Sequence, residues 1–314
     1  MIYILLSTYN GSKYLGEFLE SLSSQNITDW VLMARDDGSS DDTKSILAAF
    51  AVANPRKVEI VPDNENLGAS GSFGKLLSIA VGKNECEYIM FADQDDVWLP
   101  DKISKTYAKM QALENRYGKD TPLLIHTDLK VVDVDLDIID ESFWHYQYLN
   151  PKYQKLHSLI MQNNITGCTM MINARLAKLV LPIPSQAIMH DWWIGLVAAK
   201  FGKIGYLDSP TILYRQHSSN DTGAKRFSYM EIAKKAFTLF QKKDIYTAHL
   251  DKNIAQASAF LDRYSDLLGD DDTRMLYDLL SLKNSSFIRK RQILFEHGLQ
   301  KQGFVRNIAL ALRV

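Results

Sequence analysis

Short apolar runs alternate with amphipathic segments along the first third of the chain. The runs have the length of buried strands and carry little polar content. They span residues 2–6, 30–34, 58–61 and 88–92. Between them, apolar residues recur every three or four positions, as Tyr14, Phe18 and Leu22 do, which indicates helices with one buried face. Alternating strands and helices with short connections predict a parallel sheet covered by helices on both faces.

The pattern changes along the rest of the chain. A helix is expected from Pro100 to about Tyr117, and His190 opens another that ends near Gly202. Shorter apolar runs predict further strands, at residues 123–127, 130–132, 204–207 and 211–214. From about residue 228 onward only helical spacing is present. We therefore expect an α/β domain of residues 1–224 and a helical C-terminal region of residues 225–314.

Clusters of polar side chains directly follow three of the predicted strands. They are Ser7–Gly11, Asp36–Thr43 and Asp93–Asp96. In parallel α/β sheets, ligands bind outside the carboxyl ends of the strands, where neighbouring strand ends meet. We therefore expect the three clusters to line one ligand crevice.

The third cluster places Asp93, Asp95 and Asp96 within four residues. Acidic turns on a protein surface are common and need no ligand. Here apolar residues frame the turn on both sides, and crowded carboxylates in such a setting are unfavourable without a cation. Hard oxygen ligands suit Mg²⁺ or Mn²⁺, which in turn bind phosphate oxygens. The turn therefore predicts a site for a metal and a diphosphate.

The turn Asp36-Asp37-Gly38-Ser39 supports two interpretations. Ser39 and Asp42 have the side chains of caps for the helix that follows. A carboxylate at the same turn can instead accept the imide N–H of a uracil or thymine ring, and a helix N-terminus offers free N–H groups to a ligand. Capping and ligand binding are compatible, so the residues alone leave both interpretations open.

Asp191 lies at the start of a predicted helix, where an Asp is usually a cap. Its neighbours Trp192 and Trp193 are large flat surfaces of the kind on which sugars stack. A carboxylate between apolar rings can have a raised pKa, which suits a general base. A catalytic role is therefore an alternative to capping.

His217 ends the sequence Tyr-Arg-Gln-His. A lone histidine at such a position is most often a surface residue. It becomes a candidate metal ligand only if the sheet brings it near Asp95, where its imidazole would complete the metal's ligands.

The net charge of −1 hides a strong asymmetry. Residues 1–224 hold 20 Lys and Arg against 27 Asp and Glu, whereas residues 225–314 hold 16 against 10. Aromatic and aliphatic residues accompany the cations of residues 283–314, a pattern typical of helices that bind a membrane surface. Packing on the catalytic domain, or dimerisation, explains the pattern about equally well. Nucleic-acid binding is not expected, because residues 1–224 are acidic and the sequence carries no known nucleic-acid-binding motif.

Cysteine spacing argues against a disulfide-stabilised protein, and hydropathy argues against a membrane-spanning one. Cys86 and Cys168 show neither metal-ligand spacing nor a disulfide framework, so buried thiols in a reducing compartment are expected. No apolar stretch approaches the roughly 20 residues that a membrane-spanning helix needs. The N-terminus runs directly into a predicted strand, and no signal peptide is expected.

With these residues in hand, the chain resembles the inverting family 2 glycosyltransferases, which have the GT-A fold. Its first strand with Ser-Thr-Tyr-Asn-Gly, and Asp-Asp-Gly-Ser-Ser-Asp at 36–41, are similar to that family's nucleotide-binding segments. Asp93-Gln94-Asp95-Asp96 is similar to its metal motif, and His190-Asp191 stands where the family carries a catalytic carboxylate, often as Glu-Asp. Phe-Ala-Asp-Gln-Asp-Asp-Val-Trp, Ile-Thr-Gly-Cys-Thr and Tyr-Arg-Gln-His resemble the bacterial rhamnosyltransferase-like branch.

The resemblance implies a role for each matching residue. On the donor side, Thr8, Tyr9 and Asn10 shape the base and ribose pocket, Asp37 (or Asp36) contacts the pyrimidine, Lys75 reaches the diphosphate and Asp93 holds the sugar or ribose. Asp95 and His217 ligate Mg²⁺ or Mn²⁺. Asp191 is the catalytic base, and the residues expected on the acceptor side are Thr166, Gly167, Trp192 and Trp193. The implied fold is GT-A, a mostly parallel central sheet flanked by helices, with a C-terminal helical extension.

The implied activity is transfer of a sugar, such as rhamnose, from dTDP-rhamnose or a UDP-sugar to a saccharide acceptor. A lipid-linked acceptor on the inner face of the cytoplasmic membrane, in surface polysaccharide or lipopolysaccharide synthesis, fits the basic amphipathic residues 283–314. Two alternatives are a metal-dependent phosphohydrolase with Asp93 as nucleophile and a non-catalytic nucleotide-sugar-binding protein. The phosphohydrolase leaves the clusters at residues 7–11 and 36–43 unexplained.

Overall fold

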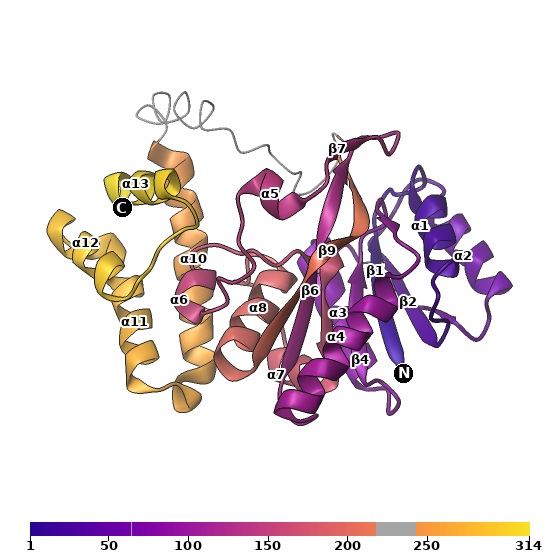
Figure 1. Ribbon diagram of the computed structural model, residues 1–314, viewed down its shortest axis with the longest axis horizontal. Helices are drawn as coiled ribbons and strands as arrows, with labels where there is room; N and C mark the ends of the chain where they lie inside the picture. The colour runs from indigo at the N-terminus through magenta and orange to yellow at the C-terminus, as the bar shows by residue number, and fades with distance from the viewer. Residues whose placement is uncertain (64, 218–242) are drawn as a thin grey trace.

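A mixed sheet forms the centre of the protein, with helices against both faces (Figure 1). The computed structural model describes residues 1–63, 65–217 and 243–314. In this part of the chain nine strands pair in the order β3-β2-β1-β4-β8-β6-β9-β5, with β7 on β6. The strands are β1 Ile2–Thr8, β2 Trp30–Asp36, β3 Val58–Ile60, β4 Tyr88–Ala92, β5 Val97–Trp98, β6 Leu123–Val132, β7 Ile138–Asp140, β8 Met171–Asn173 and β9 Lys203–Arg215.

The first half of the sheet is parallel, as the alternating pattern predicts. β1 pairs in parallel with β2 and β4, and β2 with β3. Thr8 is opposite Asp36 in this register, and Leu6 is opposite Ala92. The carboxyl ends of β1, β2 and β4 therefore meet at one edge, and the three polar clusters that follow them are neighbours.

The second half of the sheet is mixed. β8 runs antiparallel to both β4 and β6, and β5 runs antiparallel to β9, while β6 and β9 are parallel. The two pairs of short strands expected at 123–132 and 204–214 are each one continuous strand. A shift in the β6–β9 register around Asp128 marks the point where the apolar pattern is interrupted.

Helices cover the sheet on both faces. They are α1 Leu15–Ser23, α2 Thr43–Ala53, α3 Gly68–Val81, α4 Lys102–Tyr117, α5 Phe143–Gln147, α6 Leu156–Leu159, α7 Ala174–Val180, α8 His190–Phe201, α10 Lys243–Tyr264, α11 Asp270–Ser281, α12 Phe287–Glu296 and α13 Phe304–Arg313. Successive side chains of a strand face opposite sides. Tyr3 and Leu5 of β1 thus pack with α3, α7 and α8, while Ile4 and Leu6 pack with α1 and α4.

The C-terminal helices share a core with the sheet. Trp193 of α8 packs against Phe260 and Tyr264 of α10, with ring centroids 5.7 and 6.0 Å apart. The predicted boundary between residues 224 and 225 lies outside the described residues. Among those that are described, no helix combines the length and the apolar content needed to cross a bilayer. Cys86 and Cys168 are buried free thiols.

Candidate active site

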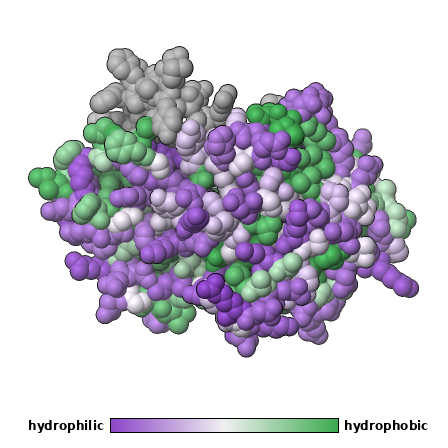
Figure 2. Space-filling model, in the orientation of Figure 1, coloured by the Kyte–Doolittle hydropathy of each residue, from purple (hydrophilic) through white to green (hydrophobic). Residues whose placement is uncertain are grey.

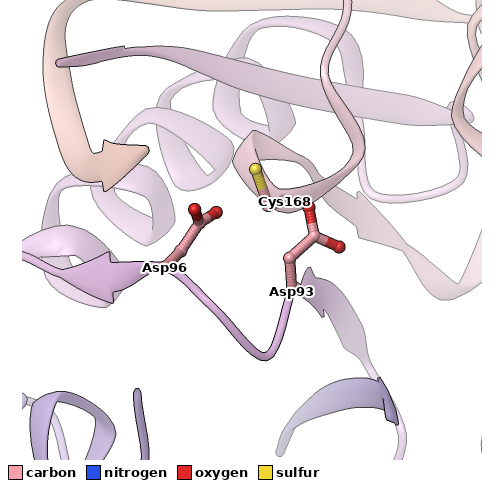
Figure 3. A group of neighbouring side chains, drawn as sticks. All are labelled: Asp93, Asp96 and Cys168. Atoms are coloured by element: carbon pink, nitrogen blue, oxygen red, sulfur yellow. The ribbon is translucent and has the colours of Figure 1, made fainter. Parts of the chain in front are cut away.

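The acidic turn between β4 and β5 concentrates negative charge at the sheet edge. Asp93 leaves the end of β4, Asp96 enters β5, and Cys168 approaches both from a 3₁₀ turn, Gly167–Thr169 (Figure 3). One ligand atom from each of the three lies within 4.8 Å of the others. Asp96 is fully buried, and its Oδ2 accepts no hydrogen bond from the described residues. Burial, together with the neighbouring carboxylates of Asp95 and Asp93, raises the pKa of Asp96 well above its ordinary value.

The fold brings His217 to Asp95 from 122 positions away in the sequence. His217 Nε2 lies 2.7 Å from Asp95 Oδ2, and its imidazole stacks on Tyr14 with ring centroids 5.0 Å apart. Proximity to Asp95 is the condition under which His217 becomes a candidate metal ligand, and the structure meets it. Asp95 and His217 could hold a divalent cation through a carboxylate oxygen and an imidazole nitrogen.

A buried arginine that the sequence analysis did not assign holds this geometry in place. Arg215 donates from Nε to the carbonyl oxygen of Asp95 at 3.0 Å, and its Nη2 pairs with Glu17 of α1 at 2.5 Å. Its guanidinium lies over the Tyr14 ring on which His217 stacks, 4.5 Å from the centroid. Its backbone N–H donates to Asp96 Oδ1 at 3.3 Å. Its position in the Tyr-Arg-Gln-His sequence is the signal that could have identified it.

A second buried cation, Lys102, begins α4 behind the acidic turn. Its ammonium lies 4.6 Å from the centroid of the Trp98 ring and makes no hydrogen bond to the described residues. Burial lowers its pKa to about 8, against the opposing influence of Cys168, Asp96 and Asp93. Nothing in the apolar pattern distinguishes Lys102 from a solvent-exposed lysine, so the sequence alone could not have placed it here.

Asp36 organises the turn after β2. Its carboxylate accepts hydrogen bonds from the Thr8 hydroxyl at 3.0 Å, from the backbone N–H of Gly38 at 3.1 Å and from the backbone N–H of Ser39 at 2.8 Å. The Ser39 hydroxyl donates to the same carboxylate. Neither Ser39 nor Asp42 makes a side-chain capping bond to α2, so the capping interpretation is wrong for both residues.

Asp37 is already fully engaged in this structure. Its carboxylate pairs with the buried Arg35 and accepts the backbone N–H of Leu67 at 2.8 Å and of Gly68 at 2.9 Å. Lys75, expected at the diphosphate, pairs with Asp63 at 2.5 Å, and Asp63 also pairs with Arg35. Asp37 and Lys75 are therefore linked through the buried Arg35 guanidinium and Asp63. A ligand contact by Asp37 or Lys75 would replace one of these ion pairs.

The first polar turn is tied to the acidic turn. Tyr9 donates its backbone N–H to Gln94 Oε1 at 3.0 Å and accepts from Gln94 Nε2 at 2.9 Å. A Cβ on Gly11 would lie 2.0 Å from Gln94 Oε1, so a larger residue there would displace the Gln94 amide from Tyr9. The Tyr9 ring is 51% exposed and Asn10 is exposed, with Asn10 Oδ1 accepting the backbone N–H of Ser40 at 2.9 Å. The Tyr9 ring is thus available to a ligand at this edge.

Asp191 stands at the start of α8 with both carboxylate oxygens bonded. The backbone N–H of Gly167 donates to Oδ2 at 2.9 Å, and Asn163 Nδ2 donates to Oδ1 at 3.3 Å. Burial raises the pKa of Asp191 to about 7 and outweighs the hydrogen bonds that favour the anion. A carboxylate with this pKa can accept a proton near neutral pH, as a general base must.

Two of the residues expected on the acceptor side differ sharply in exposure. Trp193 is fully buried in the core and donates its indole N–H to the Val180 carbonyl at 3.0 Å, so the expectation that a sugar stacks on it is wrong. Trp192 is only half-buried, with its indole N–H donated to the Leu159 carbonyl at 2.6 Å. Gly167 lies against Asp191, and an added Cβ there would be 3.6 Å from the Asp191 Cβ.

One turn of the chain connects the candidate base with the acidic cluster. Gly167 bonds Asp191 through its N–H, and the next residue, Cys168, lies against Asp93 and Asp96. Consecutive Cα atoms are about 3.8 Å apart. Asp191 and the acidic turn therefore flank the same 3₁₀ turn, which places a proton acceptor beside a candidate cation site.

Comparison with known proteins matches this arrangement to a family. The model of Glycosyl transferase family 2 matches residues 3–175. The dTDP-rhamnosyl transferase RfbG of Shigella flexneri is 27% identical over 228 residues, which cover 70% of this chain and 74% of the relative. The UDP-Glc:alpha-D-GlcNAc-diphosphoundecaprenol beta-1,3-glucosyltransferase WfgD of Escherichia coli is 26% identical over 110 residues, which cover 35% and 41%.

A solved structure agrees with the fold. The structure of S. aureus TarS 1-349 in complex with UDP-GlcNAc superposes with a TM-score of 0.57 at 15% identity and covers 94% of this chain and 72% of that one. The central sheet, the flanking helices and the C-terminal helices of this chain match the expected architecture. Since the family model spans more than half of the sequence, this chain belongs to glycosyl transferase family 2 and is a glycosyltransferase with the GT-A fold.

Proposed function

We propose that the protein moves a sugar from a nucleotide-diphosphate donor to a saccharide acceptor by a single inverting displacement. The observation that carries the proposal is the 3₁₀ turn with the acidic cluster on one side and Asp191 on the other. If the donor diphosphate binds beside the acidic cluster and the acceptor hydroxyl lies at Asp191, the anomeric carbon of the donor lies between the two. Membership of a glycosyltransferase family favours this transfer over phosphate ester hydrolysis at Asp93.

The proposal includes Mg²⁺ or Mn²⁺ at the acidic turn. The residues present fit such a cation, because Asp95 supplies a carboxylate oxygen, His217 supplies an imidazole nitrogen, and the same turn holds a buried carboxylate oxygen of Asp96 with no hydrogen-bond donor from the described residues. When bound, the cation would neutralise the charge that builds on the leaving diphosphate.

The donor residues keep the roles that the family resemblance implies. Thr8, Tyr9 and Asn10 surround the base and ribose, with the exposed Tyr9 ring as a stacking surface. Asp93 contacts the sugar or ribose. The contacts proposed for Asp37 or Asp36 with the pyrimidine, and for Lys75 with the diphosphate, require those side chains to exchange partners on donor binding.

Asp191 is the base in this proposal. Its carboxylate removes the proton from the acceptor hydroxyl, and the oxygen forms a bond to the anomeric carbon on the face opposite the diphosphate. The bond from that carbon to the diphosphate oxygen breaks, and the diphosphate leaves with the electron pair. A single displacement inverts the anomeric configuration. Asn163 and the Gly167 N–H hold the carboxylate for the step.

The names of two relatives suggest the donor and the acceptor. One relative is a dTDP-rhamnosyl transferase, and the other acts on a diphosphoundecaprenol-linked sugar. We therefore include dTDP-rhamnose or a UDP-sugar as donor and a lipid-linked saccharide of bacterial surface polysaccharide or lipopolysaccharide synthesis as acceptor. A peripheral position on the inner face of the cytoplasmic membrane, through residues 283–314, belongs to the same proposal.

The test combines donor binding with turnover. A thermal-shift panel of nucleotide sugars with and without Mn²⁺ identifies the donor, because a bound ligand raises the unfolding temperature by mass action. Asp95→Ala should abolish the metal-dependent shift, and Asp191→Asn should keep it while losing transfer. Full transfer by either variant would refute its assigned role. Donor binding without turnover, with every acceptor offered, would instead identify a nucleotide-sugar-binding protein.

A further inference from the structure

A groove lies at the edge of the sheet, at the end of α8 opposite Asp191. Its volume is about 590 Å³, which is within the usual range for small-molecule sites. The second half of α4, the last turn of α8 and the first half of β9 form its walls. Ala199 lines the groove and is eight residues after Asp191 in α8, about 12 Å along the helix axis. The groove is therefore separate from the candidate active site.

The first half of β9 forms this edge because it has a strand on one side only. Residues 203–207 pair with β6, whereas β5 pairs with β9 only at Ile212 and Leu213. In the described part of the chain no other strand pairs with residues 203–208. Helix α4 packs on one face of the sheet and α8 on the other (Figure 1). The groove therefore follows the strand edge between the two helices.

Three cations line the groove without a carboxylate partner among the described residues. They are Lys109 and Arg116 of α4 and Lys203 of β9. Arg116 Cζ and Lys203 Nζ lie 5.1 and 5.6 Å from the centroid of the Tyr117 ring, which also lines the groove. Hydrophilic residues predominate on the face of the molecule that Figure 2 shows. Positive charges gathered in a groove attract an anionic ligand.

Other groups in the groove suit neutral hydroxyls. Asp208 lines the groove and forms no ion pair with a described residue, so its carboxylate can accept hydrogen bonds from hydroxyl donors. Gln154 also lines it, and its Nε2 is buried without a hydrogen-bond partner among the described residues. The terminal torsion of glutamine is soft, so this amide can turn toward a ligand and gain a bond. The groove therefore matches a ligand that carries both anionic groups and hydroxyls.

An acidic saccharide carries both kinds of group. Its carboxylates would pair with the three cations, and its ring hydroxyls would bond to Asp208 and Gln154. A nucleotide fits less well, because Asp208 would repel its phosphates. A second copy of the chain fits less well too, because its groove has the same excess of cations and like charges repel. Membership of a glycosyltransferase family makes a saccharide the expected class of ligand.

We propose that the groove between α4, α8 and the first half of β9 binds a carboxylated saccharide chain. This site goes beyond the proposed function, because it uses neither the candidate metal ligands nor Asp191. It would retain an acidic saccharide on the protein near the candidate active site. Gln154 in its wall and Asn163, whose amide donates to Asp191 Oδ1, belong to the same segment between α5 and the 3₁₀ turn.

The experiment is calorimetric titration of the metal-free full chain with two probes. The acidic probe is trigalacturonate, and the neutral probe is maltotriose. Trigalacturonate should bind more tightly than maltotriose, and its affinity should fall as the salt concentration rises, because salt screens exposed charges. Equal affinity for the two probes, or no binding of trigalacturonate, would overturn the proposal.

Two variants locate the binding in the groove. Lys109→Gln/Arg116→Gln should weaken trigalacturonate binding at least about tenfold, since two charge-assisted hydrogen bonds are lost. Gln154→Leu should weaken it about fivefold, since one neutral hydrogen bond is lost. The matched control is Arg56→Gln/Lys252→Gln, which removes two charges from exposed residues outside the groove and should change the affinity little. Unchanged affinity in Lys109→Gln/Arg116→Gln, or an equal loss in the control, would refute the site.

Further measurements exclude other roles for the same residues. Arg116 lies in the last turn of α4, where a cation stabilises the helix end. A lower unfolding temperature of Lys109→Gln/Arg116→Gln without weaker binding would show that this is its only role. Equal binding of inorganic phosphate would identify a general anion site. A dimer of the parent that this variant loses, seen by light scattering, would identify a second copy as the occupant. Because calorimetry needs no turnover, a failure of transfer would refute the proposed function and leave this site standing.

Discussion

Replacing Asp191 with asparagine should remove transferase activity and raise stability at the same time. The carboxylate is held in a setting that favours its neutral form, with a pKa of about 7 instead of 3.8. A pKa displaced over this range corresponds to a free-energy difference of about 4 kcal/mol between the two protonation states. At neutral pH the native protein therefore carries a charge that costs free energy, and an uncharged amide would relieve it.

The structure also limits how much stability Asp191→Asn can add. Asp191 is only partly screened from solvent, and asparagine would lose the 3.3 Å hydrogen bond from Asn163 because two amide N–H₂ groups would face each other. A neutral hydrogen bond contributes about 1 kcal/mol, and solvent weakens the electrostatic cost. We expect Asp191→Asn to raise the free energy of unfolding by about 1–3 kcal/mol at pH 8.

The gain should depend on pH in a defined direction. The native pKa of Asp191 lies above the unfolded value, so between the two values the native state binds more protons and its stability falls as pH rises. Below about pH 4 the carboxyl is protonated in both states and its charge contributes nothing. The stability difference between variant and parent should therefore be smallest near pH 4 and grow until about pH 7.

Urea unfolding of the ligand-free protein at about pH 4 and pH 8 measures both the size of the stability difference between variant and parent and its dependence on pH. Asp29→Asn is a suitable control, because Asp29 is exposed and the same change of charge should have little effect there. A variant that is less stable than the parent at pH 8, or a difference that does not grow with pH, would refute the argument from burial. In the parent, transfer should rise with pH through about 7 as the base becomes ionised.

Four further substitutions test separate parts of the site. Gly167→Ala should lose most transfer, because its Cβ would lie 3.0 Å from His190 Nε2 and displace the turn; normal turnover would contradict this. Arg215→Ala should lower the free energy of unfolding by about 3–5 kcal/mol, since it breaks a buried charge network, and should raise the Mn²⁺ concentration needed for donor binding. Trp193→Ala should cost about 3–5 kcal/mol of stability in thermal melts, whereas Trp192→Ala should mainly raise the acceptor KM.

Local patterns along the chain were enough to predict the parallel half of the sheet. Strand β4 begins and ends where the apolar run Tyr88–Ala92 does, and α8 begins at His190 as its spacing predicts. The polar clusters after β1, β2 and β4 meet because parallel strands share one direction. The approach of His217 to Asp95 was predicted only as a condition, because it depends on the pairing of β9 with β5 and β6.

The sequence by itself determined where the strands of the parallel half and the helices between them lie, which strand ends carry polar groups and which residues are candidates for the chemistry, because periodicity and residue type are local properties. Only the tertiary structure decided how those groups are used. It buried Trp193 in the core, engaged Asp37 with Arg35, placed Lys102 behind the acidic turn and joined Asp191 to that turn through residues 167–168. Each of these outcomes depends on packing and desolvation between segments far apart in the chain, and no local pattern encodes which distant partner a side chain will meet.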